Sequence, residues 1–342
     1  MVARSKLSDA FRFFRKLSLR KLWNWILVFS SFQVSRWTGK AIHWGRPVSL
    51  SIEPTTACNL RCPECPSGLR SFTRNTGNLK ADLFRRTVHQ VKDHLINLTF
   101  YFQGEPYINP DFLDMVHHAH ESGIYTMTST NGHFLSKENC RKTIQSGLDR
   151  LIISIDGAKQ DTYEQYRREG TLQTVLEGAE RLIRMKQRLG VRHPYVIFQM
   201  LVVRPNEEEI DDVYEIAREI GVDEVKLKTA QLYDYQNGHD LMPQQTRFSR
   251  YKRNEDGTFS PKNPLSNECW KLWHSGVITW DGLLVPCCFD KDADHVFGDL
   301  KENAMDQVWN GHEAQAFRDR IMAGRQHIDI CSNCSEGCSV WA

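Results

Sequence analysis

The sequence predicts an α/β fold: a partial TIM-like barrel of six (βα) units, followed by a small cysteine-rich unit. Three observations lead to this prediction. Between residues 48 and 230, short apolar β-rich runs alternate with segments of helical period. There are six such units, two fewer than the closed eight-fold barrel has. Six of the ten cysteines lie beyond residue 265, which indicates a metal-binding or catalytic unit there.

The composition is that of an ordinary globular protein and excludes several other classes. The chain has 342 residues, of which 40% are hydrophobic and 25% charged, and its formal net charge is +2. These values exclude a mostly disordered chain, a collagen-like repeat and a multi-span membrane protein. Because the charges nearly balance, we expect no nucleic-acid partner. No cleavable signal peptide precedes the cysteines, so we expect reduced thiols in the cytoplasm rather than disulfides.

Residues 1–47 form a basic and apolar extension before the barrel. The first 21 residues carry seven lysines or arginines and a single acid, Asp9. The apolar stretch 22–34 is too short to cross a bilayer core of about 30 Å as a helix. Two interpretations stay open. Residues 1–34 lie on an anionic membrane surface, at its inner face, or they pack as a helix on the outside of the barrel.

The barrel is expected to cover residues 48–235. Its strands are predicted at 48–52, 98–102, 125–129, 150–155, 195–203 and 224–228. Apolar residues at steps of three and four predict helices over 79–95 and 172–183. Residues 236–264 are polar and are expected to form a linker or a long loop. In a barrel of this kind the C-terminal ends of the strands carry the chemistry.

Local signals also indicate where helices begin and end. Gly123 and Gly221 stand where helices should stop. Asn206, with Glu209 three residues later, is typical of a helix N-cap and its reciprocal acid.

Residues 265–342 are expected to form the cysteine-rich unit. Within it, residues 277–280 and 283–285 are apolar and β-rich, and the Asp-Gly pair between them predicts a hairpin with a two-residue turn. This hairpin would bring Cys287 back near the start of its first strand, within reach of Cys269.

A triplet of cysteines follows the first predicted strand. Cys58, Cys62 and Cys65 have the spacing C-x3-C-x2-C. Three thiolates on one short loop can hold three irons of a 4Fe-4S cube and leave the fourth iron open for a substrate or cofactor. The alternative is zinc, which takes four ligands, and no fourth cysteine or histidine lies nearby in the sequence.

On this triplet and on motifs at the following strand ends, residues 48–342 resemble the radical S-adenosylmethionine (SAM) enzymes. The segment Gln103-Gly104-Glu105-Pro106 resembles the family's Gly-Gly-Glu segment, with Gln103 in place of the first glycine. The resemblance implies that Gly104 and Glu105 hold the methionine amino group of SAM. It also implies that further residues at later strand ends bind SAM: Ser129, Asn131, Ser154, Asp156 and Arg167.

The same resemblance implies the chemistry. The reduced cluster gives one electron to SAM, which breaks into methionine and a 5′-deoxyadenosyl radical, and this radical takes a hydrogen atom from the substrate. Glu64 departs from the family pattern, which usually has an aromatic residue before the last cysteine of the triplet, near the adenine. The departure concerns the adenine pocket and leaves the cluster prediction unchanged.

A second set of cysteines lies in the C-terminal unit. Cys269, Cys287 and the C-x2-C pair Cys331 and Cys334 resemble the family's auxiliary-cluster domains, called SPASM when two clusters are held and twitch when one is held. Two fully ligated cubes need about eight thiolates. The unit supplies six cysteines, so we expect one auxiliary 4Fe-4S cluster on these four residues.

Two alternatives stay open for this second set. Cys288 or Cys338 could replace one of the four ligands, or the four could hold a structural zinc. The remaining cysteine, Cys140, lies in a predicted helix and is expected to be an inert packed thiol.

Substrate-binding candidates come from the last two strands. Lys226 and Lys228 alternate on the sixth strand, so both face one side of the sheet. If that side is the barrel interior, they are substrate-binding candidates, and Gln199 on the fifth strand is another. We expect a radical SAM oxidoreductase or lyase that acts on a small molecule, by a net oxidation or rearrangement aided by the auxiliary cluster. The resemblance also implies an electron donor such as flavodoxin or ferredoxin.

Two other functions compete with this one. The first is a maturase that modifies a ribosomally made peptide, although residues 1–47 are shorter than the leader-binding module that many such enzymes carry. The second, from another class, is a non-catalytic iron–sulfur electron-transfer protein. The open-iron triplet argues against it.

Overall fold

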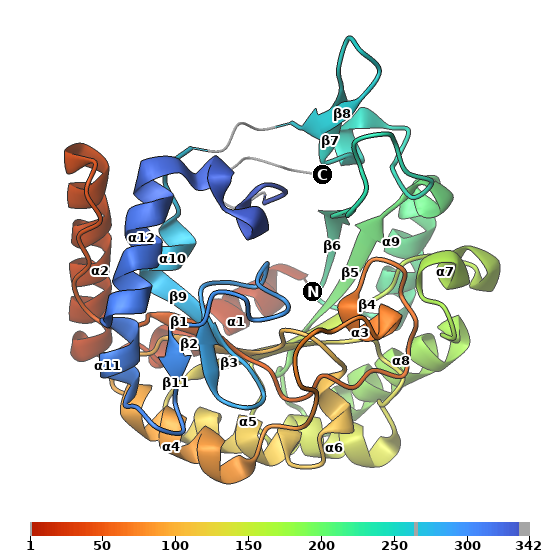
Figure 1. Ribbon diagram of the computed structural model, residues 1–342. Coiled ribbons are helices and arrows are strands. Elements are labelled where there is room, and N and C mark those ends of the chain that lie inside the picture. Colours follow the sequence, from red (N-terminus) through yellow and green to blue (C-terminus); the bar gives the residue numbers. More distant parts are fainter. Residues whose placement is uncertain (1, 263–265, 335–342) are drawn as a thin grey trace.

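A single sheet of nine strands runs through the molecule and carries both cysteine-bearing regions (Figure 1). The computed structural model describes residues 2–262 and 266–334. The strand order is β11-β10-β9-β1-β2-β3-β4-β5-β6. β1 to β6 run parallel to one another. They are β1 Ser49–Ile52, β2 Asn97–Phe100, β3 Tyr125–Thr130, β4 Arg150–Ser154, β5 Tyr195–Val202 and β6 Glu224–Thr229.

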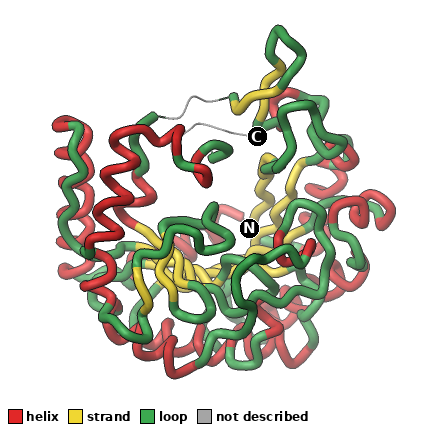
Figure 2. The backbone as a smooth tube through the Cα atoms, viewed as in Figure 1, coloured by secondary structure: helices red, strands yellow, loops and turns green. Residues whose placement is uncertain are grey.

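The six parallel strands and the helices between them confirm the predicted partial barrel. Each predicted strand begins and ends within two residues of the observed one. Figure 2 shows the strands on the inner side of the barrel and the helices as its outer layer. The helices of the outer layer are α4 Ala81–Val91, α5 Phe112–Glu121, α6 Lys137–Gln145, α7 Gln160–Tyr166, α8 Leu172–Arg188 and α9 Ile210–Ile220. The short α3 Pro66–Leu69 instead packs on the backbone of Cys62, and further short 3-10 helices lie at Pro106–Ile108 and Arg204–Asn206.

The main core lies between the sheet and this outer layer. In α8, Val175, Ala179 and Leu182 recur at steps of three and four and are completely buried. In β5, Phe198 and Met200 belong to the same core. Because side chains alternate along a strand, the residues between them face the barrel interior instead.

The glycine signals for helix ends hold, but the N-cap prediction is wrong. Gly221 ends α9 in the left-handed region at φ 84°, and Gly123 follows α5 at φ 73°. Asn206 caps no helix: its side chain bonds the backbone of Val203, Asp156 and Leu201. Glu209 accepts hydrogen bonds from Ala158 N and the Thr162 hydroxyl. Tertiary partners outcompete the local capping pattern.

The C-terminal region extends the barrel sheet. β9 pairs in parallel with β1 on the side opposite β2, and β10 and β11 continue the sheet in antiparallel fashion. The elements are α10 Trp270–His274, β9 Ser275–Ile278, β10 Leu283–Val285, β11 Gly298–Asp299, α11 Met305–Trp309 and α12 His312–Gly324, then 3-10 helices at Arg325–His327 and Asp329–Cys331.

The predicted hairpin is present as β9 and β10, but its connection is one residue longer than expected. Thr279 N donates to Leu283 O, and Leu283 N donates to the Thr279 hydroxyl, so these two residues close the hairpin. The loop is therefore Trp280-Asp281-Gly282, with Gly282 in the left-handed region at φ 93°. Before this region, residues 231–262 include a 3-10 helix Thr246–Phe248 and a two-stranded sheet of β7 Tyr251–Arg253 and β8 Phe259–Pro261.

Two N-terminal helices, α1 Val2–Arg15 and α2 Leu19–Thr38, pack on the barrel. α1 lies across the N-terminal ends of the strands, where Asp9 accepts hydrogen bonds from the Tyr125 hydroxyl and Arg150. Arg12 Nε donates to Asp149 Oδ1 at 2.8 Å. The packed interpretation of this extension is thus observed. Within residues 2–262 and 266–334, no helix has the length and apolarity to cross a membrane.

Candidate functional site

The first three cysteines lie on one loop at the carboxyl end of β1. Cys62 is buried, and Cys58 and Cys65 are half-buried. The loop folds back on itself, because Leu60 N donates to Cys58 Sγ at 3.4 Å and Cys65 N to Cys62 O at 3.4 Å. This is the end of the sheet where a parallel barrel places its reactive groups.

A largely enclosed arginine, with 17% of its side chain exposed, approaches these thiols. Arg167 Nη1 lies 3.8 Å from Cys62 Sγ. Its Nε donates to Asp156 Oδ2 at 2.5 Å, and Asp156 Oδ1 accepts from Leu201 N at 2.7 Å. Asp156 is completely buried. Two residues that the sequence assigned to SAM binding therefore form one ion pair that joins β4, β5 and the cysteine loop.

The charge environment indicates what these thiols can bind. Burial raises the pKa of Cys58 to about 12 and also raises the pKa of Cys62, which the nearby Arg167 partly offsets. A thiolate in such a buried place is stabilised by a nearby positive charge. Three cysteines on one loop with an arginine beside them fit a 4Fe-4S cluster with one iron free of protein ligands.

Gly104 joins the end of β2 to the cysteine loop. Its φ is +72°, and a Cβ at this position would lie 2.3 Å from Thr55 O and 2.8 Å from Ala57 O. Gly104 N donates to the Ser67 hydroxyl at 2.9 Å, and Glu105 N donates to Ala57 O at 2.8 Å. Only glycine fits such a close approach of two backbones.

Glu105 is bound by the end of β3. Its completely enclosed carboxylate accepts hydrogen bonds from the Thr130 hydroxyl at 2.8 Å, from Asn131 N at 2.7 Å and from Tyr107 N at 3.3 Å. Burial raises its pKa to about 7. The carboxylate thus fixes β2 against β3 in this structure, and its contact with the SAM amino group stays a prediction.

The other predicted SAM residues lie along the same inner edge. Asn131 Nδ2 donates to Asn59 Oδ1 at 2.7 Å and lies 3.9 Å from Cys58 Sγ. Ser129 pairs with Ile152 in the sheet, and Ser154 pairs with Gln199. Ser154 alternates with Ile153 and Ile155 of the main core, and Ile152, the partner of Ser129, lies between Leu151 and Ile153 of the same core. Both serines therefore face the barrel interior.

The three predicted substrate residues share the interior face. Gln199 pairs with Lys226, and Leu201 with Lys228. Leu201 packs against the small apolar cluster that contains Cys62. Side chains at paired positions lie on the same side of a sheet, so both lysines belong to the face with the cysteine loop.

The second set of thiols is assembled from distant parts of the chain. Cys269, Cys287, Cys331 and Cys334 line one enclosed pocket, with Leu272, Phe317 and Ile321 around them. The hairpin brings Cys287 to this pocket, as the sequence predicts.

A second buried arginine lies among these four thiols. Arg325 Nη2 is 3.1 Å from Cys334 Sγ, and Arg325 Nη1 donates to Glu268 O at 3.0 Å. The nearby thiols Cys269, Cys334 and Cys331 outweigh burial and raise its pKa. A buried cation among four cysteines fits an anionic cluster with a full set of protein ligands.

Over the described ranges, no three histidine, cysteine or acidic side chains converge closely enough to hold one metal ion. A cube spreads its thiolates over different irons, whereas zinc draws its ligands to a single centre.

Of the remaining cysteines, Cys288 lies outside the lining of the second pocket. It packs beside Phe102 and Val285, and Lys271 Nζ lies 3.6 Å from its Sγ. Cys140 is completely buried in α6, as expected of a packed thiol. Cys338, the other alternative ligand, lies outside the described residues.

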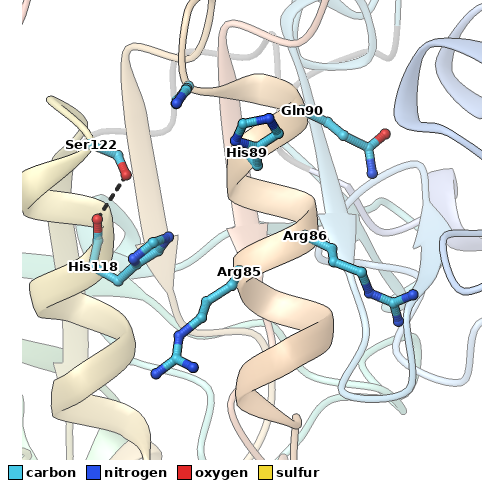
Figure 3. Close-up of a pocket in the computed structure, with 7 residues that line it drawn as sticks. Arg85, Arg86, His89, Gln90, His118 and Ser122 are labelled. Atoms are coloured by element: carbon cyan, nitrogen blue, oxygen red, sulfur yellow. Dashed lines mark hydrogen bonds between the residues drawn. The ribbon is translucent and has the colours of Figure 1, made fainter.

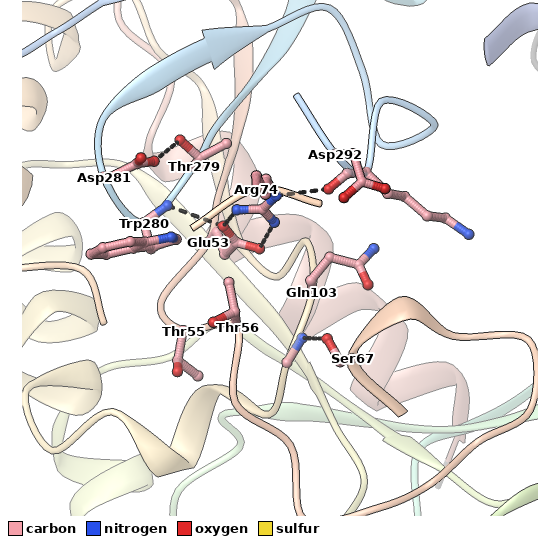
Figure 4. Close-up of polar contacts among 12 residues, drawn as sticks. Glu53, Thr55, Thr56, Ser67, Arg74, Gln103, Thr279, Trp280, Asp281 and Asp292 are labelled. Carbon is pink, nitrogen blue, oxygen red and sulfur yellow. Dashed lines mark hydrogen bonds and ion pairs between the residues drawn. The ribbon is translucent and has the colours of Figure 1, made fainter. Parts of the chain in front are cut away.

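Two polar links between the barrel and the C-terminal region have no local sequence signal. Figure 4 shows the first: Arg74 makes a two-pronged ion pair with the buried Glu53, which also accepts from Trp280 N. Arg74 Nε donates to Lys291 O at 2.8 Å. Glu53 follows β1 directly, and its partners lie 21 or more residues away, so spacing alone could not identify them.

The second link is formed by Glu64, the residue before the last cysteine of the triplet. Its carboxylate accepts from Tyr233 N at 2.9 Å and pairs with His239 at 3.3 Å. Lys291 Nζ in turn donates to the Tyr233 hydroxyl at 2.6 Å. The residue that departs from the family pattern therefore attaches the cysteine loop to residues 231–241.

A separate pocket lies away from both thiol sets. It is on the outer side of α4 and α5, and Figure 3 shows Arg85, Arg86, His89 and His118 around it. It shares no residue with either thiol set.

Two family models match the sequence. The model described as the radical SAM superfamily matches residues 52–220, and the SPASM model, described as an iron–sulfur cluster-binding domain, matches residues 269–335. The first span contains the cysteine triplet, and the second contains all four residues of the C-terminal set.

Individual proteins are similar over most or part of the chain. The tungsten-containing aldehyde ferredoxin oxidoreductase cofactor-modifying protein of Pyrococcus furiosus is 23% identical over 84% of this chain and 86% of its own length. The AdoMet-dependent heme synthase of Methanosarcina barkeri is 29% identical, but the match spans 51% of this chain and 48% of that protein. The structure of Streptococcus suis SuiB bound to S-adenosylmethionine aligns with a TM-score of 0.62 at 14% identity, over 86% of this chain and 73% of SuiB. This last likeness concerns the fold.

Proposed function

Because the chain belongs to the radical SAM superfamily and carries a SPASM-type auxiliary iron–sulfur domain, we propose that it cleaves SAM reductively and takes a hydrogen atom from a small-molecule substrate. The overall reaction is a net oxidation or a rearrangement. One observation carries the proposal. The loop after β1 that carries three thiols is flanked by residues that pack on Gly104, and one of its thiols, Cys62, lies beside Arg167 at the reactive end of the barrel.

The residues of the barrel have distinct tasks in this proposal. With a 4Fe-4S cluster and SAM bound, the site supplies a one-electron cleavage of SAM and the abstraction of a hydrogen atom. Cys58, Cys62 and Cys65 hold the cluster. Asp156 positions Arg167, whose positive charge favours the thiolate of Cys62.

The SAM pocket is proposed along the inner edge of β2 to β4. Gly104 and Glu105 take the methionine part, as the resemblance implies. Ser129, Asn131 and Ser154 offer hydroxyl and amide groups to the rest of the cofactor. Their position on one strand-end edge, near Cys58, supports this assignment.

We assign the auxiliary cluster to Cys269, Cys287, Cys331 and Cys334. Four thiolates occupy all the irons of a cube, which suits electron transfer or support of the substrate side better than chemistry at an open iron. The buried guanidinium of Arg325 balances the negative charge of such a cluster.

Two observations favour a small molecule over a peptide. The two curated relatives are named for modifying a cofactor and for making heme. On the interior face, Gln199, Lys226 and Lys228 supply polar and cationic groups that suit a polar or anionic small molecule. We also propose that a flavodoxin or ferredoxin delivers the electron, and that the enzyme works in the cytoplasm, where its thiols stay reduced.

The test is SAM cleavage by the anaerobically reconstituted full-length protein. With dithionite, the wild-type protein should release 5′-deoxyadenosine and methionine. Cys62→Ala should release neither, while Cys140→Ala, which changes a buried cysteine outside both sets, should behave as wild type. With a deuterated substrate mixture, deuterium should appear in the 5′-deoxyadenosine.

Two results would overturn the proposal in different ways. A protein that holds iron in both sites but cleaves no SAM on reduction would be an electron-transfer protein. Deuterium transfer from a ribosomally made peptide, with none from small molecules, would make the protein a maturase.

A further inference from the structure

The inner face of α2 is unusually polar for a helix that packs on a barrel. Lys21, Asn24 and Ser35 are buried there. Lys21 Nζ donates to Gly123 O at 2.6 Å, Asn24 Nδ2 to Arg46 O at 3.0 Å, and the Ser35 hydroxyl to Ile42 O at 2.8 Å. Hydrogen bonds to fixed backbone carbonyls therefore hold this face against the protein, so only the opposite face can meet a partner.

The outer face of α2 carries the apolar side chains. Leu19, Trp23 and Trp37 are 86%, 61% and 85% exposed, and Leu22 and Ile26 lie between them at helical spacing. A usual surface helix turns its apolar stripe inward, whereas α2 buries Val28 and Phe32 and also exposes a second apolar stripe on its outer face. In Figure 1, α2 stands at one edge of the molecule, with α10 and α12 beside it on its inner side.

The apolar surface continues onto α1. Leu7, Phe11 and Phe14 are exposed at steps of three and four. In total, ten of the sixteen exposed large hydrophobic residues within the described ranges belong to these two helices. A concentration of this kind marks an interaction surface rather than scattered exposure. We call the outward faces of α1 and α2 the apolar surface.

Basic residues are concentrated in this extension. Residues 1–40 contain nine lysines or arginines and one acid, Asp9, which is buried against Arg150. Acids of the barrel and of the C-terminal region neutralise part of this charge, because they form ion pairs with basic residues of the extension: Lys6 with Glu224, Arg12 with Asp149, Arg20 with Asp93 and Arg36 with Glu268. An excess of positive charge remains on the extension after these pairs are counted.

The charge of the extension distinguishes between two partners that could cover the apolar surface, a second copy of the chain and a lipid bilayer. A second copy of the chain, related by a two-fold axis, would bring two positively charged faces together. An anionic bilayer attracts the basic residues and accepts the apolar side chains in its interfacial zone. Tryptophan favours that zone, and Trp23, Trp25 and Trp37 are all exposed here.

We propose that α1 and α2 form an interfacial anchor, which binds bilayers that contain anionic lipids and lies flat on their surface. The hydrogen bonds of Lys21, Asn24 and Ser35 attach the helices to the barrel, so the anchor holds the whole enzyme at the membrane in one orientation. This inference is independent of the catalytic proposal.

The test is co-sedimentation of the reconstituted full-length protein with vesicles of phosphatidylcholine, with or without phosphatidylglycerol. Wild type should sediment with the anionic vesicles only. Trp23→Glu/Ile26→Glu should lower the partition coefficient by about a hundredfold or more, since each buried side chain contributes at least about tenfold. The matched control is Leu189→Glu/Tyr214→Glu, which changes two similarly exposed hydrophobic residues, one just after α8 and one on α9, and it should bind as wild type.

A second measurement uses the wild-type protein alone. Brominated anionic lipids should quench the tryptophan fluorescence of the wild-type protein, since Trp23 and Trp37 enter the interface. Absence of vesicle binding by wild type, equal binding to neutral vesicles, or equal binding by Trp23→Glu/Ile26→Glu would overturn the proposal. So would a dimer that this double variant dissociates while vesicles have no effect, because the apolar surface would then be a contact between copies.

Discussion

The two thiol sets are built in opposite ways. Cys58, Cys62 and Cys65 come from one loop, which local hydrogen bonds fold around the site. The C-terminal four come from the start of α10, the end of β10 and the last 3-10 helix, and only the complete fold brings them together. The comparison teaches that a site with an open iron can be carried by one loop, whereas a closed site needs several elements.

Each set also has its own arginine, and the two arginines contact their thiols in different ways. Arg167 is paired with the carboxylate of Asp156, and its Nη1 lies 3.8 Å from Cys62 Sγ. Arg325 donates from Nη1 to Glu268 O and from its backbone N to Asn267 Oδ1, and its Nη2 lies 3.1 Å from Cys334 Sγ. Each arginine thus places a positive charge beside one set of thiols.

The largest expected effect is on the iron content per chain when one thiol set is removed at a time. Wild type should hold about eight irons per chain, and a Cys58→Ala/Cys62→Ala/Cys65→Ala variant about four. A variant with Cys269, Cys287, Cys331 and Cys334 changed to alanine should also hold about four. Iron and sulfide analysis after anaerobic reconstitution measures both. About four irons in wild type and none in the barrel variant would contradict the assignment of a C-terminal cluster.

The next largest expected effect is on the stability of the reconstituted protein when either arginine is replaced. Arg325→Met leaves a buried anionic site without its cation and should destabilise the reconstituted protein by about 3–5 kcal/mol, as should Arg167→Met. Adding Asp156→Asn should restore much of the loss caused by Arg167→Met, because no unpaired carboxylate then remains buried. Thermal unfolding of the single and double variants measures this difference. Equal stability of the double variant and Arg167→Met would contradict the described role of Asp156.

Gly104 offers a test confined to the barrel site. Gly104→Ala should cost about 3 kcal/mol or more and lower iron content at the barrel cluster, because the left-handed φ and a 2.3 Å contact with Thr55 O both oppose a Cβ. Gly123→Ala is the matched control: its φ is +73°, but nothing lies within 4 Å of the added Cβ. Equal losses in the two variants would show that the docking of β2 on the cysteine loop does not matter.

The smallest expected effect is a pH dependence on the C-terminal side. Burial, aided by Arg318, lowers the pKa of His43 to about 3, and the His43 ring bonds Trp273 O in α10. The unfolded chain binds this proton at about pH 6.5, so the stabilisation is complete above that pH and is lost as the pH falls, by about 2 kcal/mol at pH 5. The unfolding midpoint of His43→Gln should fall less between pH 7 and 5 than that of wild type. The exposed His117→Gln should follow wild type.

The sequence predicted what depends on neighbours along the chain. The cysteine triplet and the six strands are local patterns, and the structure reproduces them. The hairpin loop was one residue short in the prediction because the Thr279 hydroxyl, which closes the loop on Leu283 N, competes with the Asp-Gly turn signal. The capping prediction for Asn206 failed for a related reason, since partners on other elements satisfy its side chain.

Other features lie beyond any reading of local pattern. Glu53 meets Arg74, and Glu64 meets Tyr233, only when the complete fold brings distant segments together. The basic and apolar character of the N-terminal extension was visible in the sequence. Which face would turn outward was not, because the inner polar residues of α2 find their carbonyl partners on distant loops.

The parallel pairing of β9 with β1 has a consequence for electron movement. Biological electron tunnelling depends steeply on the distance between donor and acceptor. Here the loop with Cys58 leaves one strand of the pair, and the hairpin that delivers Cys287 begins with the other. The backbone hydrogen bonds between β1 and β9 thus hold the cysteine loop and the hairpin, and with them the two proposed clusters, at a fixed distance from each other. Insertions in residues 231–262, which lie outside this pairing, should therefore leave the tunnelling distance unchanged.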